Sequence, residues 1–380
     1  MTRAFPSLVV DDYDPSTFAW DDERTERNRG ITKTQWLSLF ERSTAEFERR
    51  AREDEGSDGV RASAFASSFA TVIAIAREDA REDEVRKAVR GAAHGAYDAP
   101  WRGVNCLEMC RARDGALRAR GFYDCFSKVK REENRAALTK LRDVLASIDL
   151  AEDANGERLM SVIRGCFAGN IFDLGAAASA ALFGEGGCDF ASTKEKGIKA
   201  RPWCVDDFDA LKARWLCGAP HKKAIMFVDN SGADIVLGMI PLARELLRRG
   251  THVVIAANSV PSINDITAIE LEEQIIPALV DLGDVILSPA IADGRLRVVA
   301  SGSDMPVIDL RYLSDEIVDE AQDADLVILE GMGRGIETNL YAKFSIDSLK
   351  IAMVKHQEVA TLLGGELYDC VVKFDCAPER

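Results

Sequence analysis

The sequence predicts an α/β protein in which a mostly parallel sheet follows a helical N-terminal part. Three observations support this fold class. The first half places apolar residues at helical spacing and shows no sustained alternation of apolar and polar residues. After residue 222, short β-branched runs alternate with amphipathic stretches. The runs AIMFV and LVILE lack a polar face, which is typical of strands covered on both sides. We therefore expect a helical subdomain at residues 1–165 and an α/β domain at residues 166–380.

The helices expected in the N-terminal part follow from the spacing of large apolar residues. Residues 34–52 place Trp36, Leu37, Phe40 and Phe47 at helix-compatible positions. Further helices are expected over residues 63–77, which are rich in Ala and Ser, and over residues 134–148. The charge-dense text RRAREDEGSDG, residues 49–59, predicts a solvated loop.

The C-terminal part alternates expected strands and helices. Strands are predicted at residues 224–228, 252–256, 296–300, 326–329, 351–354 and 370–374. Helices are predicted between them at residues 234–249, 268–282, 315–322 and 357–363. Strand, helix and strand at this spacing imply crossover connections, and hence a mostly parallel sheet.

Composition limits the classes of partner. The chain carries a formal net charge of −15, which argues against nucleic acid or anionic membrane as a general partner, because both attract basic surfaces. An acidic protein can still hold a phosphate through one bound metal ion. The N-terminal text lacks the apolar region of a secretion signal, and the apolar stretch at residues 174–183 is too short to span a bilayer. We expect a cytoplasmic protein.

The nine cysteines are an odd number and form no CxxC pairs. We expect reduced, mostly buried thiols, as in an intracellular protein. Cys106 and Cys110 are four residues apart, but no second pair follows at the spacing of a zinc site. A structural zinc site and a catalytic thiol are therefore weaker alternatives.

Oxygen-bearing side chains follow two neighbouring strands of the predicted sheet. Ligands of open α/β sheets bind at the carboxyl ends of the strands, where this chain places Asp229 and Asn230 after one strand and Asp265 in the loop after the next. Carboxylate and amide oxygens are the ligands that Mg²⁺ and Mn²⁺ prefer. The three residues predict a metal site with open positions for water and a phosphate.

Helix capping is the alternative explanation for several of these polar residues. Asp229 could simply cap the following helix, Ser231 with Asp234 fits a capping box, and Thr267 with Glu270 fits another. The two explanations are compatible, because helix N-termini also favour an anion between them.

Phosphate-binding candidates lie after the later strands. Residues 331–335, GMGRG, could hold phosphate through backbone N–H groups and Arg334, although the segment is not GxGxxG and precedes no clear helix. Glu330 could orient water, contact the metal indirectly or cap the loop. Lys355 could neutralise a phosphate oxygen, or it could be a solvated surface lysine.

Other enzyme classes lack their motifs. His252 and His356 have no Ser or Cys partner in a recognisable nucleophile elbow, so a hydrolase triad is not expected. The absence of GxxxxGK[ST] argues against a P-loop kinase.

The motif FAGNIFDLG carries Asn170 and Asp173 within an otherwise apolar helical segment. Asn170 is either a buried, satisfied amide at a helix junction or a residue that lines the active-site crevice.

The motifs together resemble a known family. The run FVDNSGADIVLGMIPLARELLRRGTHVVIAANSVPSINDIT, with FAGNIFDLG, RPWCVDDF, SGSDMPVIDL, LVILEGMGRGIETN and MVKHQEVATLLGGELYDCVVKFD, is similar to the metal-dependent damage-control phosphatases, formerly domain of unknown function 89. Plant-type members and the C-terminal domain of pantothenate kinase 4 are the most alike. The resemblance covers nearly all of the chain, and the first hundred residues match only in general character.

This resemblance implies a three-layer α/β/α sandwich and a divalent ion, Mg, Mn, Co or Ni, on Asp229, Asn230 and Asp265, with Lys355 on the phosphate. It implies hydrolysis of phosphate monoesters of damaged or surplus metabolites, and it points to 4′-phosphopantetheine and its oxidised forms, such as the sulfonate. A homo-oligomer is possible within this expectation. The residues expected to bind substrate are Asn170, Asp173, Ser303, Glu330, Gly331, Gly333 and Arg334.

The expected mechanism uses a metal-activated water in preference to Asp229 as nucleophile, since the chain has Ser231 where aspartyl-phosphate phosphatases have the second Asp of DxD. Two alternatives stay open: an S-adenosylmethionine-dependent methyltransferase that uses the glycine segment, and a non-catalytic metabolite-binding protein. The sequence differs from the family pattern in two ways. No kinase domain precedes it, and its charged N-terminal loop matches the family only loosely.

Overall fold

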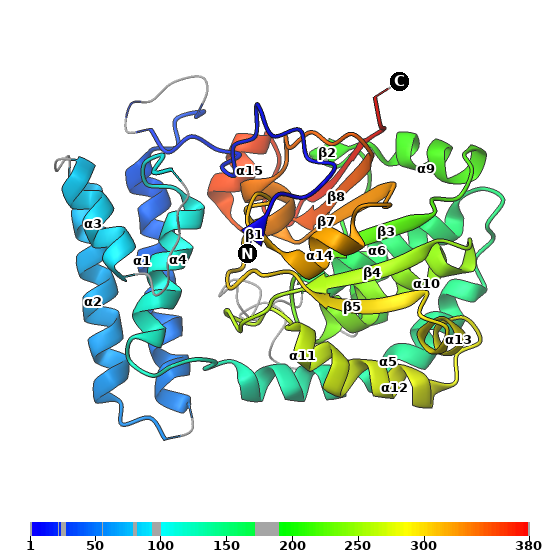
Figure 1. The fold of residues 1–380 in the computed structure, drawn as a ribbon, viewed down its shortest axis with the longest axis horizontal. Coiled ribbons are helices and arrows are strands. Elements are labelled where there is room, and N and C mark those ends of the chain that lie inside the picture. The colour runs from blue at the N-terminus through cyan, green and yellow to red at the C-terminus, as the bar shows by residue number, and fades with distance from the viewer. Residues whose placement is uncertain are drawn as a thin grey trace.

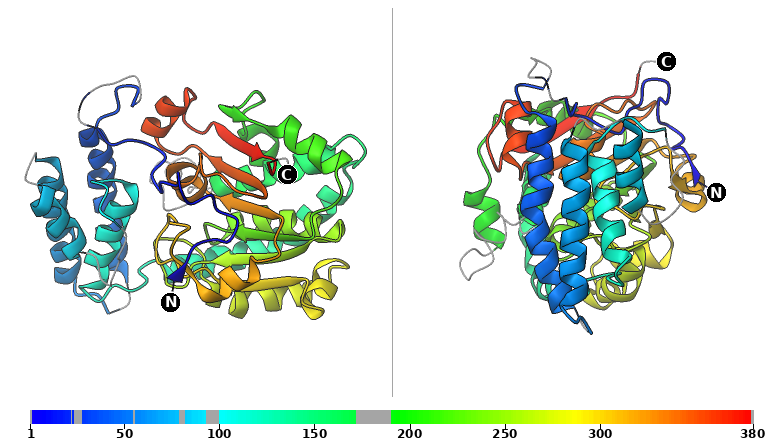
Figure 2. Two further views of the ribbon diagram at one scale, coloured as in Figure 1. Left: turned by 45° about the horizontal axis from the view of Figure 1, so that its top comes forward. Right: turned by 90° about the vertical axis from the view of Figure 1, so that its left-hand side faces the viewer.

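A seven-stranded sheet with a helical bundle beside it forms the molecule (Figures 1 and 2). The computed structural model describes residues 2–21, 23, 28–54, 56–78, 82–92, 100–171 and 190–378. The α/β class and the mostly parallel sheet are confirmed. The expected division at residues 165 and 166 stays a prediction; both residues lie within the helix α6 (Glu157–Ile171).

The sheet has the strand order β2-β9-β8-β7-β3-β4-β5. Its strands are β2 (Val205–Asp206), β3 (Lys223–Phe227), β4 (His252–Ala257), β5 (Leu296–Ala300), β7 (Leu326–Glu330), β8 (Asp347–Met353) and β9 (Cys370–Asp375). Every pairing is parallel except that between β8 and β9. Strand β8 begins four residues before its predicted start, because the polar Ser348 and Lys350 interrupt the apolar run although all seven residues of the strand are buried. A separate short pair joins β1 (Thr2–Arg3) to β6 (Leu313–Ser314).

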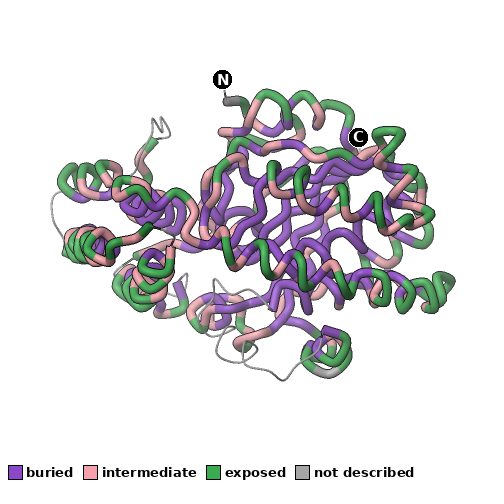
Figure 3. The backbone as a smooth tube through the Cα atoms, turned by 90° about the horizontal axis from the view of Figure 1, so that it is seen from below, coloured by how far each residue is buried: buried purple, intermediate pink, exposed green. Residues whose placement is uncertain are grey.

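Alternate residues of the strands pack into two hydrophobic cores, one on each face of the sheet. Met226 and Val228 pack with helices on one face, whereas Ile225 and Phe227 pack with the N-terminal segment and residues 308–344 on the other. This explains why AIMFV has no polar face. Figure 3 shows the buried strands enclosed by partly exposed helices and loops.

The helices around the sheet include all four predicted in the C-terminal part. Several contain π-helical turns, in which the hydrogen bonds span five residues. The sheet-associated helices are α5 (Ser127–Asp149), α6, α8 (Phe190–Ser192) with η1 (Thr193–Gly197), α9 (Phe208–Cys217), η2 (Asp234–Met239) with α10 (Ile240–Arg248), α11 (Ala268–Glu270) with η3 (Leu271–Ile275) and α12 (Ile276–Leu282), α13 (Leu287–Ala292), α14 (Asp315–Glu320), η4 (Met332–Thr338) and α15 (Gln357–Leu363).

The bundle consists of α1 (Lys33–Glu53), α2 (Val60–Arg77), α3 (Glu82–Ala92) and α4 (Cys106–Arg118). Thr32 and Gln35 form a capping box at the start of α1, which buries Trp36 and Phe40 as predicted. Helix α2 is long and apolar enough to cross a membrane by length and composition. Its buried side chains, which include Phe65, pack in the bundle core.

Two expectations for the bundle region change. Residues 49–53 of the predicted charged loop are the last turn of α1, because ion pairs such as Arg49–Glu53 and Arg52–Glu48 lie one helical turn apart and support the helix. Helix α4 was not predicted, since eleven of its thirteen residues are buried, including Arg113, and a helix buried on most sides has no amphipathic stripe to detect.

Candidate functional site

The polar residues predicted at the strand ends lie at one edge of the sheet. Asp229 and Asn230 follow β3, and Asn230 pairs through its backbone with Asp265 of the loop after β4. Glu330 is the last residue of β7, and its carboxylate accepts a hydrogen bond from the Asp229 N–H at 2.8 Å. Lys355 follows β8 and is buried. The structure therefore gathers four of the predicted residues at neighbouring strand ends, with Lys355 one strand further along.

Arg334 joins the two aspartates predicted to hold metal. Its guanidinium donates to Asp229 Oδ1 and to Asp265 Oδ2, and also to Asn258 Oδ1 at 3.0 Å. Burial lowers the pKa of Arg334, but the carboxylates of Asp265 and Asp229 raise it overall, so the side chain carries a full positive charge. Arg334 was predicted to reach a phosphate; in this structure it is buried and held by carboxylates.

A second group of carboxylates lies behind Asp229. Asp229, Asp234 and Glu330 each offer an oxygen, and the three oxygens lie within 4.8 Å of one another. Burial raises the pKa of Asp229 and of Glu330 well above the usual range, and the neighbouring carboxylates add to this shift. Burial and mutual repulsion make this cluster a place where a cation would be stabilising.

Asn170 holds this acidic group together. Its amide N–H groups donate to Asp234 at 2.8 Å and to Glu330 at 3.1 Å, and its carbonyl accepts from the Met353 N–H at 3.2 Å. Helix α6 approaches closely because Gly169 has no side chain: a Cβ there would lie 2.8 Å from Asp234 Cα. Asn170 is thus a buried, satisfied amide that orders the site. Asp173 lies outside the described residues.

The donor set fits a hard divalent cation. The Oδ1 atom of Asn230 is buried and has no hydrogen-bond partner among the described residues, while its Nδ2 donates to Asp229 at 3.0 Å and to Asp234 at 2.9 Å. A buried acceptor without a partner is costly unless a donor or an ion satisfies it. Asn230 and the carboxylates of Asp229 and Asp265 together offer only oxygen ligands.

The glycine segment differs from its prediction. Residues 332–338 form the π-helical turn η4, so the segment does begin a helix. Gly331 has φ +91°, and a Cβ on it would collide with the carboxylate of Asp229. Gly331 therefore allows the close approach of η4 to Asp229, which in turn aims Arg334 into the acidic group.

Two of the predicted hydrogen-bonding roles change. Thr267 and Glu270 form the expected capping box, but Ser231 and Asp234 do not, since the cap position before η2 is Ala233 and no side chain bonds there. The hydroxyl of Ser303 contacts backbone groups of its own loop, at Met305 and Val307.

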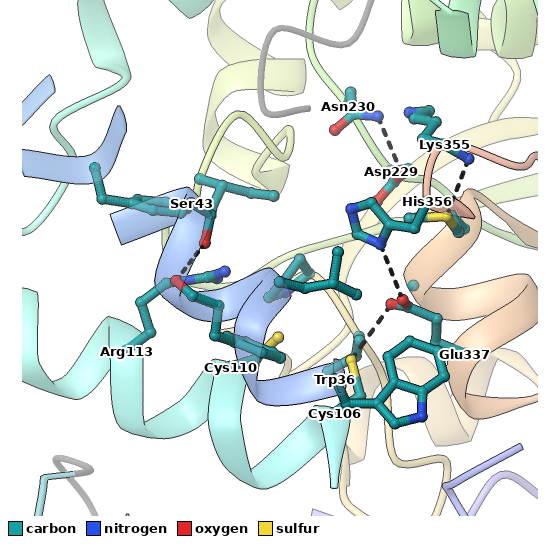
Figure 4. Close-up of a pocket in the computed structure, with 18 of the residues that line it drawn as sticks. Trp36, Ser43, Cys106, Cys110, Arg113, Asp229, Asn230, Glu337, Lys355 and His356 are labelled. Atoms are coloured by element: carbon teal, nitrogen blue, oxygen red, sulfur yellow. Dashed lines mark hydrogen bonds and ion pairs between the residues drawn. The ribbon is translucent and has the colours of Figure 1, made fainter. Parts of the chain in front are cut away.

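A cavity opens beside Asp229, Asn230 and Lys355 (Figure 4). One wall comes from the bundle, and sequence reasoning did not anticipate it. This wall carries mostly apolar side chains from α1 and the thiols of α4, and its residues include Trp36, Leu39, Phe40, Phe47, Cys106 and Cys110. The cavity therefore has polar strand ends on one side and a mostly apolar wall on the other.

Two polar residues of the cavity received no role in the sequence analysis: Glu337, which it did not name, and His356, which it considered only for a hydrolase triad. His356 Nδ1 lies 3.6 Å from one oxygen of Glu337, and the Cys106 thiol donates to the other oxygen at 3.3 Å. The hydrogen bond with Cys110, together with burial, raises the pKa of Cys106 well above the usual range, so this thiol stays protonated and is a poor nucleophile. The only available signal was the position of His356 beside Lys355.

Comparison with known proteins identifies relatives over most of the chain. A family described as the damage-control phosphatase ARMT1-like domain matches residues 34–371. A damage-control phosphatase of Arabidopsis thaliana is 53% identical over 267 residues, which are 70% of this chain and 71% of that protein.

Longer relatives match over part of their length. Pantothenate kinase 2 of Oryza sativa is 43% identical over 72% of this chain and 32% of its own length. The 4′-phosphopantetheine phosphatase of Mus musculus is 34% identical over 69% of this chain and 37% of its own length. The chain thus spans about a third of each of these two proteins.

The fold also has a solved counterpart. The crystal structure of a DUF89 family protein from Pyrococcus horikoshii superimposes with a TM-score of 0.60 at 16% identity, covering 88% of this chain and 96% of the other.

Proposed function

The chain belongs to the damage-control phosphatase ARMT1-like family, and we propose that it is a divalent-metal-dependent phosphatase acting on phosphate monoesters of small metabolites. The single observation that carries this proposal is the position of Asp229, Asn230 and Lys355 on one cavity, since it pairs oxygen donors for a cation with a positive charge for a phosphate. Members of this family are phosphatases.

Asp229, Asn230 and Asp265 are the proposed ligands of the ion. When bound, Mg, Mn, Co or Ni would polarise the phosphoryl oxygens and make a nearby water more acidic. Asp234 and Glu330 orient the ligands from behind, through the Asn230 amide and the Asp229 N–H. This arrangement is supported by the buried Oδ1 of Asn230, which has no hydrogen-bond partner among the residues that the structure describes.

Lys355 is the proposed partner of the phosphate, and it would offset the charge that spreads over the phosphoryl oxygens during transfer. Arg334 is a positioning residue in this scheme, because it fixes the separation of Asp229 and Asp265. Asp229 is engaged by the proposed ion and by the guanidinium of Arg334, which favours water over Asp229 as the attacking group.

The proposed substrates are 4′-phosphopantetheine and its oxidised forms, such as the sulfonate. Support comes from the mouse relative named for that activity and from the apolar cavity wall, which suits an extended organic tail. We also propose that the protein acts in the cytoplasm and binds neither nucleic acid nor membrane. A homo-oligomer is compatible with the proposal.

The methyltransferase alternative loses its main support, because the arginine of the glycine segment is buried and held by the carboxylates of Asp229 and Asp265. A non-catalytic metabolite-binding protein is the remaining alternative. Release of phosphate from an ester would distinguish a phosphatase from this metabolite-binding alternative.

The test is phosphate release from a panel of esters that includes 4′-phosphopantetheine and its sulfonate. The protein is stripped with EDTA and then supplied with Mg²⁺, Mn²⁺, Co²⁺ or Ni²⁺. Release that returns with metal supports the proposal, and the order of the substrates tests the pantetheine assignment. Folded protein that releases no phosphate with any metal would favour the metabolite-binding alternative.

A further inference from the structure

An alkyl phosphate poses a chemical problem that the metal site and Lys355 do not solve. When the P–O bond breaks, its electron pair stays on the ester oxygen, and an alkoxide is a poor leaving group unless it receives a proton. A positioned acid with a pKa near the working pH supplies this proton most effectively. Among the residue types that line the cavity, histidine is the one whose ordinary pKa lies near neutral pH, and the cavity holds His356.

Several other ionisable groups of the cavity are poor donors. Asp229 belongs to the proposed metal site, and Lys355 is the proposed partner of the phosphate. Burial lowers the pKa of Arg113, but the Asp114 carboxylate raises it overall. Cys106 has a pKa raised well above the usual range, and its proton is directed at Glu337. His356 is therefore the lining residue best suited to give a proton and take it back.

The geometry orients the imidazole. Glu337 Oε1 lies 3.6 Å from the buried Nδ1, which has no hydrogen-bond partner within the described part of the chain, so Glu337 acts on this nitrogen as a nearby charge. Because Nδ1 is buried beside the Glu337 carboxylate, Nε2 is the ring nitrogen left for proton transfer. Figure 4 shows the His356 ring between Glu337 and the Asp229–Asn230 end of the cavity. The thiol of Cys106 holds the second oxygen of Glu337 in place.

We propose that His356 is the general acid that protonates the leaving alcohol, with Glu337 as its positioning residue. This inference rests on the proposed phosphatase function. Water attacks phosphorus, the ester P–O bond breaks with its electron pair on oxygen, and that oxygen takes the proton from Nε2 to become the alcohol. Nε2 is reprotonated by the proton that the attacking water releases. One water and one phosphate ester thus yield one alcohol and one hydrogen phosphate.

The experiment compares two leaving groups in the metal-loaded, full-length protein. 4-Nitrophenyl phosphate releases a stable anion that needs no proton, whereas 4′-phosphopantetheine releases an alcohol that does. For His356→Asn, we expect kcat on 4′-phosphopantetheine to fall about 10²–10⁴-fold and kcat on 4-nitrophenyl phosphate to fall less than about tenfold. Asn is a favoured helix cap, so the substitution suits the position of His356 before α15.

Two further variants sharpen the comparison. Glu337→Gln keeps the size of the side chain and should give a smaller loss with the same preference for the alkyl ester. His252→Asn, at the exposed start of β4, is the matched control and should leave the rates on both esters unchanged. Equal losses on the two esters in His356→Asn would overturn the general-acid role while leaving the phosphatase proposal intact. Wild-type protein that hydrolyses neither ester would overturn both.

Discussion

Charged side chains lie near both ends of strand β8, and the two groups differ in whether their surroundings stabilise the ionised carboxylates. At its amino end, Asp347 accepts hydrogen bonds from Arg214 at 2.8 Å and from the Ala377 N–H at 2.8 Å, and lies 2.8 Å from His221 Nε2. Burial raises the pKa of Asp347, but the His221 hydrogen bond and the charged neighbours lower it overall, to about 2. This carboxylate is satisfied, and its charge stabilises the fold.

At the carboxyl edge of the sheet, the balance is reversed. Four buried carboxylates, those of Asp229, Asp234, Asp265 and Glu330, gather near the guanidinium of Arg334. Burial raises the pKa of Asp229 and Glu330, so the surroundings disfavour their ionised carboxylates. A fold selected for stability alone has no need of such a cluster, so the difference supports the proposed cation site at the carboxyl edge.

The largest expected effect follows from removing one proposed ligand at the carboxyl edge. Asp265→Asn should lower metal-dependent phosphate release at least about 10³-fold, because a bound ion supplies several kcal/mol of charge stabilisation. Isothermal titration with Mn²⁺ should show weakened binding. Asp281→Asn, on the exposed surface of α12, is the matched control. Wild-type turnover and metal affinity in Asp265→Asn would remove Asp265 from the site.

Removing the charge of Lys355, the proposed partner of the phosphate, should have the second largest effect. Lys355→Gln should lower kcat/KM about 10²–10³-fold, since one directed charge on the transferred phosphoryl group is worth about that much. Metal affinity should change little, which distinguishes this variant from Asp265→Asn. Lys222→Gln, an exposed lysine just before β3, serves as the control. A loss of metal binding in Lys355→Gln, with the fold intact by circular dichroism, would contradict a role confined to the phosphate.

The arrangement of residues at the carboxyl edge could be predicted where the residues are close together in the sequence. Asp229 and Asn230 directly follow an apolar strand, and the Thr267–Glu270 capping box spans only four positions. Arg334 could not be assigned to Asp229 in this way, because the two are 105 residues apart and their contact depends on the close approach at Gly331. A glycine-rich text alone does not show which way its arginine points.

The cavity wall was harder to predict for a different physical reason. Leu39 and Phe40 belong to a helix that was predicted, yet periodicity identifies an apolar face without saying which cavity it borders. Helix α4 contributes Cys106 and Cys110 to the wall, and its burial on most sides hides the helical period. Helix α1 could therefore be predicted from the sequence, whereas its place in the cavity wall required the packed structure.

A substitution in that wall should have a moderate effect that depends on the substrate. Leu39→Ala removes apolar contact worth about 1–2 kcal/mol, so KM for 4′-phosphopantetheine should rise roughly tenfold. KM for the small substrate phosphoethanolamine should stay within about twofold, because it does not reach an apolar wall. Steady-state kinetics on both esters measure this, with the exposed Leu150→Ala as control. Equal increases for the two esters would place Leu39 outside the tail-binding wall.

The smallest effect on activity is expected at the amino end of β8, where the charge serves stability. Asp347 has a folded pKa of about 2 against an ordinary value of 3.8. Its contribution, about 2 kcal/mol, is therefore fully present above pH 3.8 and is lost as the pH falls toward 2. Asp347→Asn should lower the free energy of unfolding by about that amount at pH 7, and the difference from wild type should shrink as the pH is lowered from 4 toward 2. Urea unfolding across this range measures the difference, and phosphate release at pH 7 should match wild type.

A stability difference that does not change with pH would show that Asp347 acts through packing and neutral hydrogen bonds. Lost turnover in a folded variant would show that the two ends of β8 are coupled.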